Sequence, residues 1–251
     1  ILNPGNGGGI AISSIIADNG AGALTLVVTG GNSVTLTGAN TFTGGIVLNS
    51  GTLSYNTVAN NTALGASTNS ITFNGSATLT QTAASMNNAR GITLANGAIA
   101  TFANATVVTT YSGKITGTGG VRISNTTAIA TTFSGANDFV GPVDITLGYF
   151  TTGSTTATGN ANNPVNIANA ATTGLTLANN ISIGSLSGGG TTGGLVTLGA
   201  NTLTVGSNNE STTFAGVISG TGAITKTGTG TLTLTGTNTY TGTPNLNGGL
   251  V

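Results

Sequence analysis

The sequence predicts an all-β chain that folds as a solenoid, with short strands stacked in parallel in successive coils. Apolar and small polar residues alternate over short runs that end in Gly or Asn, which is typical of strands separated by tight turns. A set of motifs also recurs at long, fixed intervals. A solenoid explains such a repeat because each coil must present the same face to its neighbour. Sandwiches and barrels also contain short strands, but neither requires a repeated sequence.

The composition favours an ordered chain. The 251 residues include 43 Gly, but 37% are hydrophobic, only 3% are charged, and the formal net charge is zero. Gly-rich disorder normally goes with low hydrophobicity or high charge, and this chain has neither. Four Lys and Arg residues cannot form the basic face that nucleic acid or an anionic membrane surface requires. We therefore expect no nucleic-acid partner and, without a long apolar run, no direct membrane insertion of this segment.

The residue types exclude several kinds of chemistry. The sequence contains no Cys and no His. It therefore has no disulfide framework, thiolate nucleophile, histidine metal site or Ser-His-Asp triad. We expect no cofactor and no enzymatic activity. The chain opens on Ile rather than Met and shows no signal-peptide pattern, so we interpret it as a processed or truncated piece of a longer protein.

Taken in order, the chain shows strand and turn patterns from end to end. A Gly-rich turn at 1–12 leads into a strand expected over 10–16. Pairs of short strands are expected within 70–80, 91–102 and 194–205. The segment 151–170 is the least apolar and is expected to be a loop. No linker divides the chain, which we interpret as a single solenoid domain spanning 1–251.

A motif of the form Gly-x-Asn-x-aromatic-x-Gly occurs three times, with copies 97 and then 101 residues apart. About 20 residues before each copy lies a second pattern, Ile-x-Gly-x-Gly-x-Ile/Val, at 115–121 and 218–224, with a looser form at 16–24. We interpret this as an internal repeat of about 100 residues, with copies near 15–55, 114–150 and 217–251. The repeat positions are Gly38, Asn40, Phe42, Gly44, Gly135, Asn137, Phe139, Gly141, Gly236, Asn238, Tyr240 and Gly242.

Each motif residue suits a stacked coil. Asn tolerates a left-handed conformation at a corner and can hydrogen-bond along the stack. The aromatic residue can stack between coils, and Gly allows sharp corners. Low charge fits as well, because equivalent positions lie about 4.8 Å apart in neighbouring coils, where like charges repel. At roughly 20–25 residues per coil, the chain would form about 10–12 coils and a rod about 50 Å long.

The segment from Gly222 to Gly242 resembles the autotransporter-associated β-strand repeat, also called the passenger-associated transport repeat. That motif runs Gly-x-Leu-x-Lys-x-Gly-x-Gly-x-Leu-x-Leu-x-Gly-x-Asn-Thr-Tyr-x-Gly, and Ile224 replaces its first Leu. The matching residues are Gly222, Lys226, Gly228, Gly230, Leu232, Leu234, Gly236, Asn238, Thr239, Tyr240 and Gly242. The Asn40 copy keeps the second half of the motif, and the Asn137 copy keeps less, with Asp138 in place of Thr. The resemblance implies a right-handed parallel β-helix exported to the bacterial surface, often as an adhesin or passenger stalk.

The few charged residues offer a weak candidate site. Paired carboxylates would have to come from Asp18, Asp138, Asp144 and Glu210, and Lys114 and Arg122 lie near two of them in sequence. We interpret these residues as turn and solvent-facing positions. A sugar-cleaving or calcium-binding site on the surface is the alternative.

Two further patterns admit a second interpretation. Phe42, Phe139 and Tyr240 could form platforms for sugars rather than stacked aromatic residues within the solenoid. Threonine occupies alternate positions from 229 to 241. This run favours ordinary β-structure, with an ordered-water, ice-binding surface as the alternative.

These observations predict a non-enzymatic structural or adhesive segment of a bacterial surface or secreted protein, located outside the cell. The alternative is a subunit of an extracellular filament that assembles by end-to-end stacking, because open strand edges template further pairing. A carbohydrate-active β-helix enzyme is a distant third hypothesis. The expected partners are other copies of the chain, or a host-surface or glycan ligand.

Overall fold

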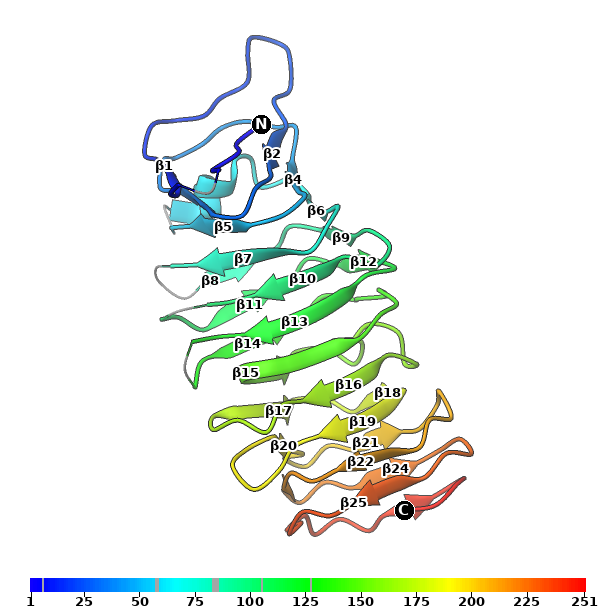
Figure 1. Cartoon of the computed structure of the whole chain (residues 1–251). Helices are drawn as coiled ribbons and strands as arrows, with labels where there is room; N and C mark the ends of the chain where they lie inside the picture. The colour runs from blue at the N-terminus through cyan, green and yellow to red at the C-terminus, as the bar shows by residue number, and fades with distance from the viewer. Residues whose placement is uncertain (6, 57–58, 83–85, 105, 127) are drawn as a thin grey trace.

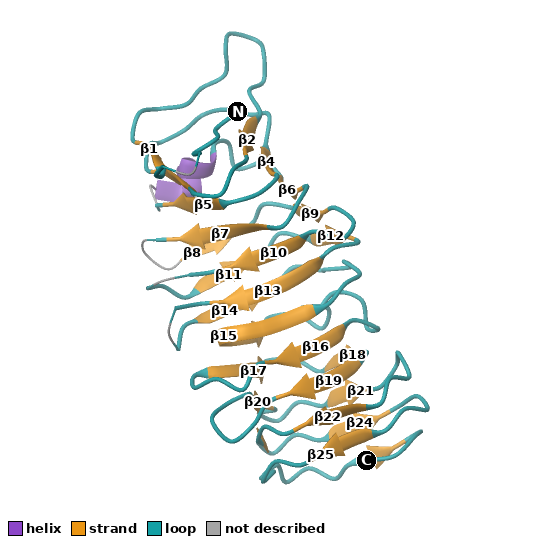
Figure 2. Ribbon diagram, in the orientation of Figure 1, coloured by secondary structure: helices purple, strands orange, loops and turns teal. Residues whose placement is uncertain are grey.

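A computed structural model describes residues 1–5, 7–56, 59–82, 86–104, 106–126 and 128–251. The chain is an all-β solenoid of about 10 turns, with the two termini at opposite ends of the stack (Figure 1). Every pairing between named strands is parallel over the described residues, which confirms the predicted fold class and number of coils. Figure 2 shows that loops connect the strands around each coil. The described part of the chain holds no helix with the length and apolar character needed to cross a bilayer.

Each coil passes over up to three faces, named here in chain order. The second face is the longest, with eleven strands in register. They are β1 (Ile10–Ile12), β3 (Ser33–Leu36), β5 (Thr52–Tyr55), β7 (Ala77–Gln81), β10 (Ile99–Phe102), β13 (Gly120–Ser124), the first half of β15 (Val143–Thr152), β16 (Pro164–Ile167), β19 (Ser185–Gly188), β22 (Thr212–Phe214) and β25 (Leu232–Leu234).

The third face follows the second face in most coils. Its strands are β8 (Met86–Asn88), β11 (Thr109–Tyr111), β14 (Ala130–Phe133), the second half of β15, β17 (Thr173–Leu177), β20 (Leu195–Thr197) and β23 (Ile218–Ser219). Because β15 continues from one face onto the other, the second and third faces form one 17-stranded sheet.

The first face consists of two shorter sheets. The N-terminal sheet holds β2 (Leu26–Val28), β4 (Ile46–Leu48), β6 (Ile71–Phe73), β9 (Ile92–Leu94) and β12 (Ile115–Gly117). The C-terminal sheet holds β18 (Ile181–Ile183), β21 (Leu203–Val205), β24 (Ile224–Lys226) and β26 (Asn245–Leu246).

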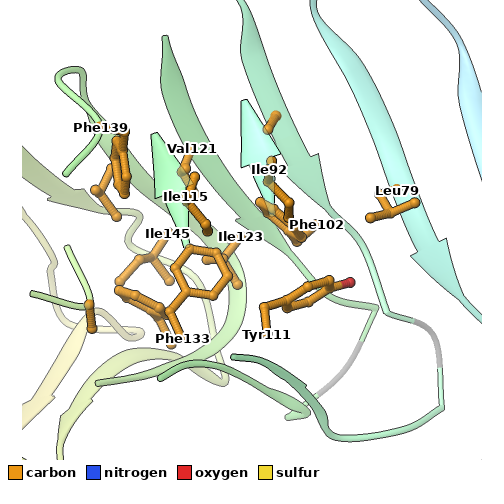
Figure 3. Packing of buried hydrophobic residues seen from close by; sticks show 14 of the residues in the cluster. Leu79, Ile92, Phe102, Tyr111, Ile115, Val121, Ile123, Phe133, Phe139 and Ile145 are labelled. Atoms are coloured by element: carbon orange, nitrogen blue, oxygen red, sulfur yellow. The ribbon is translucent and has the colours of Figure 1, made fainter. Parts of the chain in front are cut away.

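The core fills the space between the three faces because inward and outward side chains alternate along every strand. On the first face, Ile71, Ile92 and Ile115 stack in register and are buried. Between the second and third faces, Phe133 of β14 packs edge-on between Phe102 of β10 and Phe150 of β15, with ring centroids 5.0 Å away on both sides. Figure 3 shows Phe102 and Phe133 within the core. Identical inward positions therefore build columns of similar side chains along the axis, which is the arrangement expected of a repeated sequence.

Three local expectations require correction. Among the described residues, one short 3₁₀ helix, η1 (Ala59–Leu64), interrupts the otherwise strand-and-turn chain, and it occupies the third-face position between β5 and β6. The strand expected over 10–16 ends at Ile12. The loop expected over 151–170 is present only at 153–163 and 168–170, because β15 extends to Thr152 and β16 occupies Pro164–Ile167.

The repeated motif is out of phase with the coil. The copies around Asn40 and Asn238 lie at the third-face position, since Asn40 N–H bonds Thr62 O of η1 and Thr239 N–H bonds Ile218 O of β23. The copy around Asn137 lies on the first face, since Asp138 N–H bonds Ile115 O of β12. Successive copies are therefore about four and one third, then about four and two thirds, coils apart. Two of the three positions of the coil therefore accept the same motif.

Candidate functional site: the inter-coil ladder

The three motif asparagines make the same hydrogen bond to the preceding coil. The side-chain Oδ1 of Asn40 accepts the backbone N–H of Ile16 at 2.8 Å. Asn137 Oδ1 accepts Ile115 N–H at 2.8 Å, and Asn238 Oδ1 accepts Ile218 N–H at 2.9 Å. The two sequence patterns, the one that begins with Ile and the one that contains Asn, are therefore the two layers of a single stacking contact.

Two of these asparagines also reach the following coil. Asn40 Nδ2 donates to Ala63 O at 2.7 Å, and Asn137 Nδ2 donates to Ala157 O at 3.4 Å. Both side chains are buried, so their amide groups would be costly to leave unpaired. Each amide therefore joins three consecutive coils. The left-handed conformation expected of these residues is wrong, because among the described non-Gly residues only Thr172 and Asn209 have positive φ.

The motif glycines are required by close packing rather than by their φ angles. None of the six has a positive φ, so none of them needs the left-handed conformation that glycine permits. A Cβ added at any of them would lie less than 3.0 Å from a backbone atom of the preceding coil. At Gly141 that atom is Gly119 O, and at Gly242 it is Gly222 O. At these positions the backbone therefore packs directly against the backbone of the preceding coil.

The motif aromatics point into the core. Phe42 and Phe139 are both 0% exposed, so neither can act as a platform for a sugar. Tyr240 is partly buried and packs against the same core. The aromatic positions therefore contribute packing, as the interpretation of stacked aromatic residues requires.

A second pair of asparagines completes the ladder and was not identified from the sequence. Asn69 Nδ2 donates to Phe42 O, and Asn163 Nδ2 donates to Phe139 O, both at 2.9 Å. Each also donates to a carbonyl five residues earlier in its own turn. The available signal was the shared spacing Gly-x-x-x-Asn, which begins at Gly65 and at Gly159. This spacing lies one coil after the motif, and it is too short to be recognised as a repeat without the structure.

The charged residues form two separate ion pairs instead of one cluster. Lys114 pairs with Asp138 at an exposed position, and Arg122 Nη2 lies 3.2 Å from Asp144 Oδ2 on the second face. The hydrogen bond from Lys114, followed by one from Thr116, holds the pKa of Asp138 below its usual value. Both pairs join adjacent coils, which is how charges are tolerated in a stack. Among the described residues, no group of three potential metal ligands comes together.

The remaining acidic residues serve turns. Asp18 accepts the N–H groups of Leu24 and Thr43 and the Thr43 hydroxyl, and the first of these bonds contributes most to the lowered pKa of Asp18. Glu210 accepts hydrogen bonds from Ser185 and Asn208. These four carboxylates thus lie in four different local settings.

Lys226, the lysine of the repeat, points inward. It is 1% exposed in β24, and its Nζ donates to Thr227 O and Gly228 O. Its ammonium group therefore supports the turn that follows its own strand. It does not face solvent as a binding group.

The threonines from 229 to 241 do not form one flat surface. Only Thr233 lies in a named strand, β25, because the chain turns around the coil over this stretch. An ice-binding array requires threonines side by side on one face, and this run lies along the chain rather than along the stack. The ordinary β-structure interpretation holds for Thr233, and the other six threonines lie outside the named strands.

Comparison with known proteins points to one family. The passenger-associated transport repeat matches residues 26–54 and 224–251, which correspond to the first and third copies of the motif. The chain is 35% identical over 216 residues to the adhesin BmaC autotransporter of Brucella suis biovar 1 (strain 1330). This alignment covers 84% of the chain but only 5% of that relative. No solved structure matches the chain.

The matched segments begin on strands β2 and β24 of the first face and continue into the motifs that build the inter-coil ladder. The repeat recognised in sequence and the contact that joins the coils are therefore the same feature. The chain is a parallel β-solenoid that carries the passenger-associated transport repeat in two places, and over most of its length it is similar to an autotransporter adhesin.

Proposed function

We propose that the chain is a non-catalytic segment of a bacterial surface or secreted passenger, where it acts as a rigid stalk and contributes to adhesion. The observation that carries this proposal is the unbroken stack of eleven second-face strands, in a chain similar to an adhesin. Asparagine side chains on the other two faces add hydrogen bonds between the coils. A solenoid of this kind is stiff along its axis because every coil is hydrogen-bonded to the next.

The arrangement of the charged groups supports a non-catalytic role. A glycosidase needs two carboxylates on either side of one bond, one of them kept protonated by its surroundings. Asp138 instead has a lowered pKa and pairs with Lys114, and Asp144 pairs with Arg122. Incubation of the purified chain with a panel of polysaccharides should give no new reducing ends.

Adhesion can be tested by display. A non-adherent bacterium that displays this chain on a neutral carrier should bind epithelial cells or matrix-coated wells more than the same bacterium with the carrier alone. Electron microscopy of the purified chain should show short, straight rods. Normal display without any gain in attachment would contradict the adhesive part of the proposal, and flexible particles would contradict the stalk.

End-to-end assembly is a second candidate function. In the last coil, Leu246 and Leu250 are 62% and 67% exposed, and β26 is paired on one edge only, with β24. An open strand edge next to exposed apolar side chains favours pairing with another strand, here one from a second copy. Sedimentation velocity over a 100-fold concentration range tests this. Growth into filaments supports it, and monodisperse single rods at every concentration contradict it.

A further inference from the structure

A column of threonines runs up the outside of the third face. Thr110, Thr132, Thr151, Thr176 and Thr197 occupy directly successive positions in neighbouring coils. Each is partly buried or exposed, while the residues on either side of it in the strand are buried. With neighbouring strands about 4.8 Å apart, the five side chains form a straight row along the axis. Figure 1 shows these strands, from β11 to β20, along one side of the stack.

The hydroxyl groups of this column are available to a ligand. Within the described residues, none of the five hydroxyls is hydrogen-bonded to another protein group. Threonines elsewhere bond to the preceding coil, as when Thr82 and Thr146 donate to carbonyl groups at 3.2 and 3.0 Å. A hydroxyl group can donate one hydrogen bond and accept two. The column is therefore a row of unused donors and acceptors.

A second, apolar column lies beside the threonines. Ala130, Tyr149, Gly174 and Leu195 follow one another in register on the same outer surface. The Tyr149 ring lies over Gly174, where an added Cβ would be 3.1 and 3.2 Å from two ring atoms, so the glycine makes room for the ring. Leu195 lies two coils after Tyr149, and its side chain is 38% exposed. The aromatic ring thus lies along the sheet surface instead of projecting away from it.

We propose that these two columns bind an extended, uncharged polysaccharide of the β-1,4-glucan class, with the glycan chain parallel to the solenoid axis. Neither column contains a charged residue, which favours a neutral ligand. A pyranose ring presents apolar C–H groups on its faces and hydroxyl groups at its edge. The Tyr149 column provides the apolar contact, and the threonine column provides hydrogen bonds at regular intervals. This inference deepens the adhesive role proposed above and rests on it.

Affinity electrophoresis of the purified, intact chain in gels that contain hydroxyethylcellulose tests the inference. The chain should be retarded, and cellohexaose in the sample should reduce the retardation. Thr151→Val combined with Thr176→Val keeps the shape of the face and removes two hydroxyl groups, so binding should weaken about 10-fold. Tyr149→Ala should also weaken it about 10-fold, while Tyr149→Phe should leave it within about twofold.

The matched control lies on another face. Thr72 and Thr93 are adjacent outward threonines on the first face, and Thr72→Val with Thr93→Val should leave binding unchanged. Thermal unfolding of each variant identifies any loss of folding, and the isosteric threonine variants keep the test valid if Tyr149→Ala unfolds. No retardation of the wild-type chain, or equal weakening by the first-face control, would overturn the inference. Adhesion of displayed bacteria without glucan binding would remove this site and leave the proposed adhesive role standing.

Discussion

The Oδ1 atom of Asn137 accepts a hydrogen bond from the backbone N–H of Ile115, in the preceding coil, at 2.8 Å. Its Nδ2 group donates to Ala157 O in the following coil. One buried side chain therefore occupies a donor and an acceptor from two different coils. Asn40 repeats the arrangement with Ile16 and Ala63. The energetic consequences of such a contact can be measured at Asn137.

Replacement of Asn137 by Ala should lower the free energy of unfolding by about 1–3 kcal/mol, because the N–H of the buried Ile115 loses its acceptor. Urea unfolding measured by circular dichroism gives this value. Asn162→Ala is the matched control, because Asn162 is exposed and, within the described residues, only its backbone N–H is hydrogen-bonded, to Asn160 Oδ1. Its effect should stay below about 0.5 kcal/mol. Equal effects of the two substitutions would show that the ladder does not stabilise the stack.

Two glycines offer a test of backbone contact between coils. Gly141→Ala places a methyl group against Gly119 O of the preceding coil, so the two coils must separate locally. We therefore expect the substitution to destabilise the protein by about 1–3 kcal/mol. Gly91→Ala should be neutral or stabilise the protein by up to about 1 kcal/mol, because the nearest atom to the new Cβ is Lys114 O at 3.9 Å and φ is not positive. Thermal unfolding of the two variants in parallel measures both effects. A stable Gly141→Ala variant would contradict the packing explanation.

The class of fold could be predicted because the responsible signals are local. Alternation of inward and outward residues, as in the Ile-Thr-Phe of β6 and the Ile-Thr-Leu of β9, follows from the two-residue period of a strand. The fixed spacing of Asn40, Asn137 and Asn238 indicated a stack. The pattern that begins with Ile115 also recurs before each copy, but the sequence does not show that the Asn137 side chain bonds the Ile115 N–H in the preceding coil, so the exact role of these residues could not be predicted.

The face of the coil on which each copy of the motif lies could not be predicted from the sequence either. Loop lengths differ from coil to coil, so 97 residues bring Asn137 to the first face while Asn40 and Asn238 lie at the third-face position. The columns on the third face have the same origin. Tyr149 and Gly174 are neighbours only because of the register between β15 and β17, and 25 residues separate them in sequence. Register between coils depends on every intervening turn and is not encoded by any single motif.

The lowered pKa values of two carboxyl groups lead us to expect that the folded solenoid loses stability at low pH. Hydrogen bonds from Lys114 to Asp138 and from Leu24 N–H to Asp18 hold the pKa of each carboxyl below its usual value of 3.8. A pKa that is lower in the folded state adds stability above the unfolded pKa, and this stability is lost as the pH falls through the folded pKa. The melting temperature should therefore stay level between about pH 8 and 5, where the sequence has no His to titrate, and fall between about pH 4 and 2.

Asp18→Asn combined with Asp138→Asn should make the acid limb of this profile shallower, because neither amide titrates. Differential scanning calorimetry from pH 2 to 8 measures the profile for both proteins. An unchanged slope below pH 4 would mean that other groups cause the acid sensitivity.

The cluster of buried aromatic rings around Phe133 should contribute strongly to stability. Phe133 is fully buried, with the rings of Phe102 and Phe150 5.0 Å away and that of Tyr111 5.8 Å away. Phe133→Ala should cost about 3–5 kcal/mol, since it removes these contacts and leaves a cavity that the stiff coils on either side cannot close. Phe133→Leu should cost less than half as much, because it keeps most of the volume.

Val140→Ala provides the control for this measurement, because Val140 is 50% exposed and should contribute less than about 1 kcal/mol. Chemical unfolding, followed by both tyrosine fluorescence and circular dichroism, also shows how far the disturbance spreads. In a stack whose coils contact only their neighbours, loss of the Phe133 contacts should allow the two halves of the solenoid to unfold separately. A single transition, shifted as a whole and identical with both probes, would instead show that the stack unfolds as one cooperative unit despite the lost contacts.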